Sequence, residues 1–290
     1  MGVGCSLGTG RRRGYVGDCA MGLGQRPLAR TVDVTVASVA RMYDFLLRGK
    51  DSYPADRAAC ERLADAVPDL VSLVESQRAF SLAAVHRLAT RHGVRQFLDF
   101  GCGLPSWVNT HQVAQQADRA SRVVYIDRDP MVVAHGRAML EEQGRTAVVQ
   151  GDLLDGGGLF GNPRVSELID FTRPVAVMMT SVLHCLTDDE RPVEAVRSLL
   201  DRLAGGGFLV LSQWVSEDAH LRDRVARIMH RSTAGAWGQV RTPAEVDRFF
   251  HGLVLEEPGL GDVSAVALTR RADTEASGLL EYGGVGRLQR

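Results

Sequence analysis

Lysine is nearly absent from this sequence: of the 34 basic side chains in its 290 residues, only Lys50 is a lysine and the rest are arginine. The 35 acidic side chains balance them, so the formal net charge at pH 7 is −1. This balance excludes a general attraction to nucleic acid or to an anionic membrane surface, and neither is expected as a partner. The arginine excess is typical of a GC-rich genome, and it makes the position of Lys50 informative.

Cysteine is also scarce, and its spacing is not that of a metal site. The five cysteines form no CxxC pair and no cysteine–histidine spacing typical of zinc, so no metal is expected. Free thiols in a reducing cytoplasm are the simplest interpretation. No run of about 18 apolar residues occurs, and glycine-rich residues follow Arg11-Arg12-Arg13 where an exported protein would have an apolar segment. We therefore expect a cytoplasmic protein.

The first part of the chain has the periodicity of helices. Residues 1–30 are expected to form a flexible arm. Apolar residues then recur at helical spacing through residues 31–92, which predicts a helical segment in front of the main domain. Gly49 ends the first predicted helix, Pro54 lies in the first turn of the second, and Pro68 opens a third.

From residue 93 the pattern changes to short apolar runs that alternate with helices. Runs of this kind, nearly continuous in apolar residues, are typical of parallel strands covered on both faces. The sequence thus predicts an α/β fold with a doubly wound, mostly parallel, Rossmann-like sheet over residues 93–272. An antiparallel hairpin over residues 253–269 closes it, and residues 273–290 are expected to form a tail. The predicted strands are 96–100, 122–127, 146–149, 174–179 and 208–211.

Ligands of such sheets bind at the carboxyl ends of the strands, and here the first turn is rich in glycine. Asp99 lies at the end of the first strand, and Gly101 and Gly103 let the backbone turn sharply and approach a ligand closely. A dinucleotide-binding loop would have a third glycine where Ser106 stands, and Asp99 would repel a pyrophosphate. An acidic loop suits a ligand with a sulfonium and an ammonium group better, so S-adenosylmethionine (SAM) is favoured over NAD. A structural glycine turn that binds neither is the remaining interpretation.

Three later segments fit the same cofactor. Asp127 ends the second strand, where an acidic side chain can accept hydrogen bonds from both ribose hydroxyls of an adenosine. Asp152 and Leu153 follow the third strand, where a carboxylate can bind the adenine amino group and an apolar side chain can cover the ring. Ser181 and His184 follow the fourth strand, next to the expected site of methyl transfer. His184 is the predicted general base, because its ordinary pKa suits neutral pH; a histidine hydrogen-bonded to a loop is the alternative.

Seven segments together match one family, although none would do so alone. They are ARMYDFLLRGKDSYPADR (40–57), VRQFLDFGCGLP (94–105), VVYIDRDPMVVAHGRAML (123–140), VVQGDLLD (148–155), PVAVMMTSVLHCLTDD (174–189), RTPAEVDRFFHGLVLEEPGL (241–260) and YGGVGR (282–287). On these segments the chain resembles the actinobacterial SAM-dependent methyltransferase family that was long catalogued as a domain of unknown function. The resemblance implies a class I Rossmann-like methyltransferase whose N-terminal helices fold over the cofactor.

The resemblance implies the same roles for the glycine loop, for Asp127 and for Asp152 with Leu153, and it adds a lid. In this lid, formed in part by residues 43–53, Lys50 would meet the methionyl carboxylate and tyrosines would pack on the adenosine. The further residues that it implies in cofactor binding are Tyr43, Asp51, Tyr53, Arg128 and Ser181.

Among the positions that depart from the family pattern, two change the charge at the expected cofactor site. Arg48 stands where the family has glycine, and Arg128 stands where asparagine is usual. We expect a SAM-dependent methyltransferase that acts on a small-molecule acceptor in specialised metabolism. The departures keep open a catalytically inactive SAM- or nucleoside-binding regulatory protein, and an NAD oxidoreductase is a third interpretation.

Overall fold

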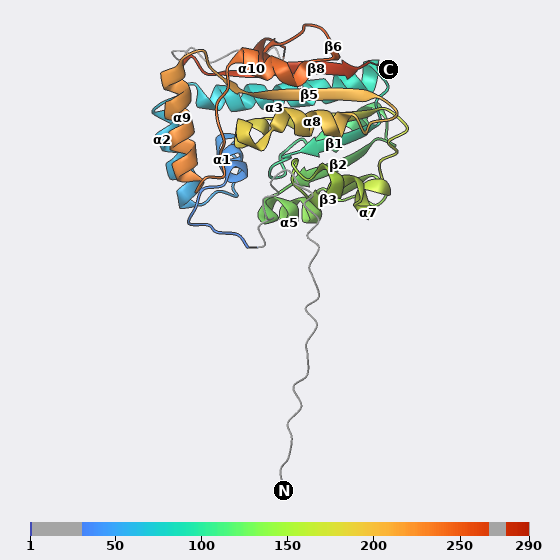
Figure 1. Ribbon diagram of the computed structural model, residues 1–290, viewed down its shortest axis with the longest axis horizontal. Coiled ribbons are helices and arrows are strands. Elements are labelled where there is room, and N and C mark those ends of the chain that lie inside the picture. The colour runs from blue at the N-terminus through green and yellow to red at the C-terminus, as the bar shows by residue number, and fades with distance from the viewer. Residues whose placement is uncertain (2–30, 267–276, 290) are drawn as a thin grey trace.

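A mixed sheet of eight strands runs through the centre of the molecule, with helices on both of its faces (Figure 1). In this computed structural model the described residues are 1, 31–266 and 277–289. The arm expected over residues 1–30 therefore lies, apart from Met1, outside the described residues. Within the described ranges, no helix combines the length and the apolar character that crossing a bilayer requires.

Five strands form the parallel part of the sheet, as the apolar runs predict. Their order is β3-β2-β1-β4-β5, so successive strands are added in opposite directions on either side of the β1–β4 pair. Such a reversal leaves a crevice at the carboxyl ends of the two strands. The strands are β1 Gln96–Phe100, β2 Arg122–Asp127, β3 Thr146–Gln150, β4 Val175–Thr180 and β5 Gly207–Val215. The predicted doubly wound α/β fold is confirmed.

The antiparallel strands expected near the C-terminus are present, but their pairing differs from that of the predicted hairpin. β8 (Leu280–Leu288) pairs with β5. Both β6 (Leu253–Leu255) and β7 (Gly261–Asp262) pair with β8 rather than with each other. Residues 280–288, which the sequence analysis assigns to a tail, are thus an inner strand of the sheet.

Glycine explains why this inner strand is hard to recognise. A Cβ atom at Gly283 would lie 1.9 Å from the carbonyl oxygen of Leu211, and one at Gly286 would lie 2.8 Å from the Leu253 side chain. Only glycine lets the neighbouring strands approach so closely. In the sequence, a segment with this many glycines has the composition of a loop rather than of a strand.

Two sets of helices cover the sheet. The set α3 (Leu70–Arg91), α4 (Thr110–Ala117), α5 (Pro130–Met139) and α11 (Val263–Val266) shares one hydrophobic cluster with the strands. The set α6 (Gly156–Phe160), α7 (Pro163–Ser166), α8 (Pro192–Leu200), α10 (Pro243–Asp247) and the 3₁₀ turn η3 (Arg248–Phe250) shares the other. Two further 3₁₀ turns, η1 (Leu183–Cys185) and η2 (Asp188–Glu190), follow β4.

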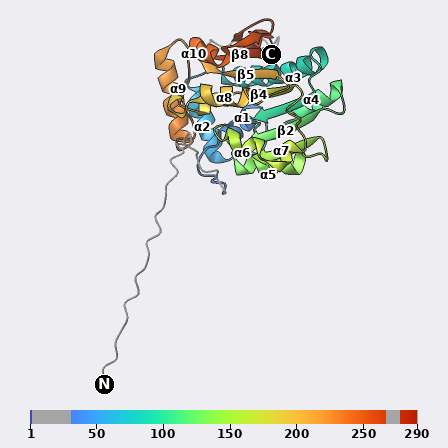
Figure 2. The same ribbon diagram turned by 45° about the vertical axis from the view of Figure 1, so that its right-hand side comes forward.

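A third helical layer covers one end of the sheet. It consists of α1 (Val39–Leu46), α2 (Pro54–Ala64) and α9 (Ala219–Ser232). Figures 1 and 2 both show α2 and α9 side by side at this end. The layer has its own core, in which Met42, Leu63, Val225 and Trp214 are buried. The N-terminal segment is therefore packed firmly against the edge of the main domain.

A buried ion pair holds α1 to the start of α2. Nε of Arg41 lies 2.8 Å from Oδ2 of Asp56, and the two side chains are 2% and 0% exposed. The Asp56 carboxylate also accepts hydrogen bonds from the backbone amides of Ser38 (2.9 Å) and Tyr53 (2.8 Å). Arg41 donates to the carbonyl oxygen of Val36 at 2.5 Å. One buried carboxylate thus ties together three stretches of the N-terminal segment.

Candidate functional site

A cavity of about 830 Å³ lies at the carboxyl ends of β1, β2 and β4, where the strand order reverses. Residues 31–51, which include α1, form one wall, and α3 contributes another. Doubly wound folds bind their ligands at this place. The cofactor residues predicted from the sequence that line the cavity are Tyr43, Lys50, Asp51, Asp99, Gly101, Gly103, Asp127, Arg128, Asp152, Leu153 and Ser181. The structure therefore brings together most of the predicted site.

In the turn after β1, two glycines expose the backbone to the cavity, because they have no side chains. Gly101 and Gly103 have φ angles of +60° and +67°, a conformation that glycine adopts without strain. A Cβ atom at Gly101 would lie 2.5 Å from a methyl carbon of Val182, so this turn also packs against the segment after β4. The Gly101 amide donates to the carbonyl oxygen of Ile126 at 2.8 Å, which fixes the turn against β2.

Asp99 places a buried carboxylate beside this turn. Its side chain accepts a hydrogen bond from Oγ1 of Thr110 at 2.7 Å, and the residue is 7% exposed. Burial raises the pKa of Asp99, while the Thr110 hydrogen bond and the charge of Arg78 act in the opposite direction. A ligand that brings an ammonium group to this carboxylate would stabilise its charged form.

Asp127 connects β2 to the glycine turn. Its Oδ2 accepts a hydrogen bond from the Gly103 amide at 3.0 Å, and its Oδ1 accepts one from the Asp129 amide at 2.9 Å. Burial raises the pKa of Asp127 to about 6, against the lowering effect of these hydrogen bonds. Each carboxylate oxygen keeps a lone pair free, so the group can still accept hydrogen bonds from two neighbouring hydroxyls.

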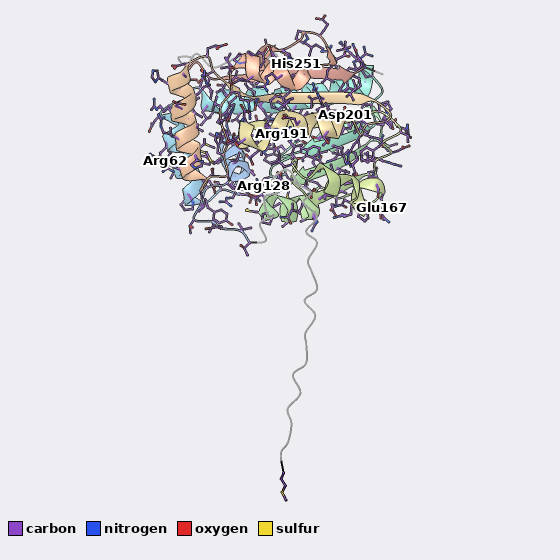
Figure 3. The ribbon with its side chains drawn as sticks, viewed as in Figure 1. Arg62, Arg128, Glu167, Arg191, Asp201 and His251 are labelled. Atoms are coloured by element: carbon purple, nitrogen blue, oxygen red, sulfur yellow. The ribbon has the colours of Figure 1, made fainter. Side chains whose placement is uncertain are left out.

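Arg128 pairs with the carboxylate that is expected to meet the adenine. Its Nη1 lies 3.6 Å from Oδ2 of Asp152, whose side chain is 8% exposed. Figure 3 shows Arg128 between α1 and α5, and the side chain of Leu153 is buried in the same wall of the cavity. Arg128 thus adds a cation that offsets the charge of Asp152.

The lid turn is folded around Asp44. The backbone amide of Asp51 donates to Oδ2 of Asp44 at 2.8 Å, and the Gly49 amide donates to the Asp44 carbonyl oxygen at 2.7 Å. Arg48 has a φ of +64°, in the left-handed region that favours glycine. A glycine, which the resemblance leads us to expect at this position, would adopt this turn freely, and Arg48 adopts it at a cost in strain.

Two side-chain contacts attach residues 38–51 to the main domain. Oγ of Ser38 donates to Oδ2 of Asp129 at 2.7 Å, and Nδ1 of His135 lies 3.7 Å from Oδ2 of Asp51. Both contacts lie on the β2 and α5 side of the cavity. Lys50 lies between them in sequence, exposed at the cavity wall.

Tyr53, expected to pack on the adenosine, does not line the cavity. It is the residue before α2, where its backbone amide is bound by Asp56. Its ring lies under the guanidinium of Arg41 at 5.4 Å and packs against Leu104, Met131 and Val132. Tyr53 therefore packs outside the cavity, between Arg41 of α1 and the start of α5.

His184 does not have the surroundings of a general base. It is 0% exposed and does not line the cavity. Its ring stacks on Trp237 at a centroid distance of 4.1 Å and lies 5.2 Å from the ring of Trp214. Burial, with a smaller effect from the charge of Arg241, lowers the pKa of His184 to about 3. The predicted role is corrected for a physical reason: a position after β4 does not determine which way the side chain points.

We expect His184→Phe to fold and to bind cofactor like the wild type, because an aromatic ring still fills the space between two indoles. His184→Ala should instead lower the free energy of unfolding by about 2–4 kcal/mol, because it leaves a cavity in the core. Urea denaturation and calorimetry with S-adenosylhomocysteine (SAH) measure the two effects. A His184→Phe variant with wild-type stability and SAH affinity but no methyl transfer would restore the histidine as the base.

Helix α3 contributes residues that the sequence analysis does not single out. Gln77, Arg78 and Ser81 line the cavity, and Gln77 and Ser81 are buried. Nε of Arg78 is buried and has no hydrogen-bond partner among the described residues, and its Nη2 donates to the carbonyl oxygen of Val108. Buried polar residues within the apolar pattern of a long helix are the signal that could have revealed this wall.

The opening of the cavity carries exposed apolar side chains. Trp107 is 91% exposed and Met139 is 66% exposed, and both line the cavity. By contrast, Trp214 is buried in the core of the end layer, where it stacks on Tyr43. An exposed indole at a rim offers a flat apolar surface to a ligand.

Known proteins resemble this chain over most of its length. A family model described as S-adenosyl methyltransferase matches residues 25–289. The crystal structure of a candidate methyltransferase from Thermobifida fusca is 37% identical, with a TM-score of 0.79 over 89% of this chain and 97% of that one. The crystal structure of a DUF574 family protein from Streptomyces avermitilis is 35% identical, with a TM-score of 0.79 over 89% of this chain and 99% of that one. No curated protein matches the sequence.

Proposed function

The chain belongs to the S-adenosyl methyltransferase family, and on that basis we propose that it methylates a small-molecule acceptor of specialised metabolism. It is a SAM-dependent methyltransferase, so its cofactor is SAM. The observation that carries the proposal is the cavity at the β1–β4 reversal, which the lid, the glycine turn and Asp127 enclose together.

The residues of the cavity fit the chemical groups of this cofactor. The Asp127 carboxylate suits a pair of ribose hydroxyls, and Leu153 offers an apolar surface to the adenine ring. Asp99 lies where it can meet the ammonium group of the methionyl part. A glycine turn without Cβ atoms lets the ligand contact the backbone. When bound, SAM supplies a methyl group on a positively charged sulfur.

The protein's own contribution is to bind, orient and enclose. The Ser38–Asp129 and Asp51–His135 contacts hold residues 38–51 beside the cavity, where a bound ligand would be shielded from water on that side. The strand ends hold the ligand against a rigid sheet. Fixed geometry of this kind lowers the barrier by making the encounter of the two reactants intramolecular.

The rim supports a small, partly apolar acceptor. Trp107 and Met139 place apolar surface at the opening of the cavity. The formal net charge of −1 gives no long-range attraction to a nucleic acid acceptor. An aromatic or otherwise flat acceptor would pack on the indole while its nucleophilic atom reaches inward.

Arg78 and Lys50 both line the cavity, and we expect Arg78 to contribute more than Lys50 to binding the methionyl carboxylate. Arg78 is partly buried and its charge acts on Asp99, whereas Lys50 is exposed. Arg78→Gln should weaken SAH binding about 10–100-fold, and Lys50→Ala or Lys50→Arg less than about fivefold, because exposed ion pairs contribute little. Calorimetry with SAH measures both, and adenosine, which lacks the carboxylate, is the control ligand. A larger loss for Lys50→Ala would reverse the assignment.

Transfer of isotopically labelled methyl groups tests the proposed function. We expect label from SAM to enter the low-molecular-weight fraction of an extract from the producing organism when the protein is added. An Asp127→Ala variant serves as the negative control. Label that enters protein or nucleic acid would contradict a small-molecule acceptor. Tight SAH binding without any transfer would favour the regulatory alternative.

A further inference from the structure

Three oxygen-bearing side chains from three separate elements lie together at one corner of the cavity. Tyr43 comes from α1, Ser181 follows β4, and Glu281 lies in β8. Oγ of Ser181 donates a hydrogen bond to Oε1 of Glu281 at 2.8 Å. Tyr43 and Ser181 line the cavity, and Glu281 lies one hydrogen bond behind them with 0% exposure. Within the described part of the chain, Oε2 of Glu281 and the Tyr43 hydroxyl have no hydrogen-bond partner.

The fold holds this corner rigidly. Glu281 lies directly opposite Trp214 in the β5–β8 pairing, and the Tyr43 ring stacks on the same indole at 6.0 Å. Ser181 has a φ of +57°, a left-handed conformation that costs a serine strain. Its amide donates to the carbonyl oxygen of Ser212 at 2.7 Å, which keeps the strained residue in place. Strain of this kind persists at sites where a side chain must be aimed in one direction.

The corner has negative and neutral groups but no cation among the described residues that act on Glu281. The groups that act on it are Ser181, Ser212 of β5 and Asp262 of β7. Burial is the main cause that raises the pKa of Glu281 to about 8. Burial and the charge of Glu281 raise the pKa of Tyr43. A positive charge brought into this corner would therefore draw a proton off the carboxyl group.

We propose that Ser181 and Glu281 form a proton-accepting pair that faces the transferable methyl group, and that the acceptor is an alcohol, a phenol or an amine. The inference rests on the proposed function and names its acceptor chemistry. A nucleophile without a proton, such as a thioether, would need no such pair. The phenol of Tyr43 lies where it can hydrogen-bond the same nucleophilic atom.

A neutral acceptor loses one proton when it is methylated. The lone pair of the acceptor's oxygen or nitrogen forms the new bond to the methyl carbon as the carbon–sulfur bond breaks and leaves its electron pair on sulfur. The acceptor's proton passes to Oγ of Ser181, and the serine's own proton passes to Oε1 of Glu281. The serine ends unchanged, and the Glu281 carboxylate ends as the neutral acid.

Calorimetry with SAM and SAH on the full-length protein tests this inference without an acceptor. The two ligands differ in the sulfonium charge, so titrations at pH 7 in phosphate and in Tris measure the protons that each releases. We expect SAM to release up to about 0.9 proton more than SAH, because an acid of pKa about 8 is largely protonated at this pH. Protonation changes at Asp127 cancel in the comparison, because both ligands carry the same ribose.

Glu281→Gln is the matched variant, because its amide oxygen can still accept the Ser181 hydrogen bond. It should bind SAH within about twofold of the wild type and should show no difference in proton release between SAM and SAH. A difference that survives in this variant would assign the proton to another group and overturn the proposal. If the variant does not fold, the wild-type titrations decide alone.

The possible results separate this inference from the proposed function. SAM and SAH that both bind with equal proton release, at pH 7 and across the range from about pH 6 to about pH 9, overturn the Ser181–Glu281 pair and leave the methyltransferase assignment standing. If neither ligand binds, the proposed function fails and the pair fails with it. A labelled product methylated on the sulfur of a thioether, which has no proton to lose, would also contradict the pair.

Discussion

Replacing Asp56 by alanine should lower the free energy of unfolding by about 3–5 kcal/mol, the usual cost of leaving one member of a buried ion pair alone. Arg41 is 2% exposed and would keep its charge without the carboxylate that lies 2.8 Å away. The backbone amides of Ser38 and Tyr53 would lose their acceptor as well. Urea denaturation followed by circular dichroism measures the change.

An exposed pair in the same helical layer provides the control. Asp223 and Arg227 lie 4.0 Å apart with side chains 73% and 62% exposed, so Asp223→Ala should change stability by less than about 0.5 kcal/mol. Replacing Arg41 and Asp56 together by leucine should recover much of the loss, because no unpaired charge remains buried. If Asp56→Ala is as mild as Asp223→Ala, the ion pair does not hold the N-terminal segment together.

Replacing Asp127 by alanine should weaken SAH binding about 100-fold or more. The variant removes the carboxylate that would accept two ribose hydrogen bonds, and bonds to a charged group contribute about 1.5–3 kcal/mol each. It also frees the Gly103 amide, which holds the glycine turn against β2. Calorimetry with SAH measures the affinity.

The matched control for this variant is Asp170→Ala. Asp170 is exposed, precedes β4 at the opposite edge of the sheet, and bonds only to nearby Thr172 through its side chain among the described contacts. Its replacement should leave SAH affinity within about twofold of the wild type. An Asp127→Ala variant that binds SAH as tightly as Asp170→Ala would place the ribose elsewhere.

The parallel strands and their ligand edge were predictable because they depend on local pattern. Strands buried on both faces must be apolar throughout, so residues 122–127 and 175–180 stand out in the sequence. The acidic and glycine residues that follow them then meet at one edge by topology alone. Asp99, Gly101 and Asp127 therefore appear together in the cavity, as the sequence analysis expects.

Residues whose role depends on distant packing were not predictable in this way. Glu281 lies in β8, a strand so rich in glycine that its sequence has the composition of a loop. Only the pairing of β8 with β5 brings Glu281 behind Ser181. Arg78 lies in a long helix, where a charged residue normally faces solvent. His184 follows the right strand but points into a cluster of indoles rather than into the cavity. Side-chain direction after a strand and contacts between distant segments leave no periodic signal in the sequence.

We infer that the lid, the glycine turn and Asp127 enclose one SAM molecule at the β1–β4 reversal. A crystal structure of the protein with SAH tests this most directly. We predict one SAH in the cavity, with its ribose hydroxyls within hydrogen-bond distance of the Asp127 carboxylate and its adenine against Leu153. An SAH molecule bound outside this cavity, or bound in it with the ribose away from Asp127, would contradict the account.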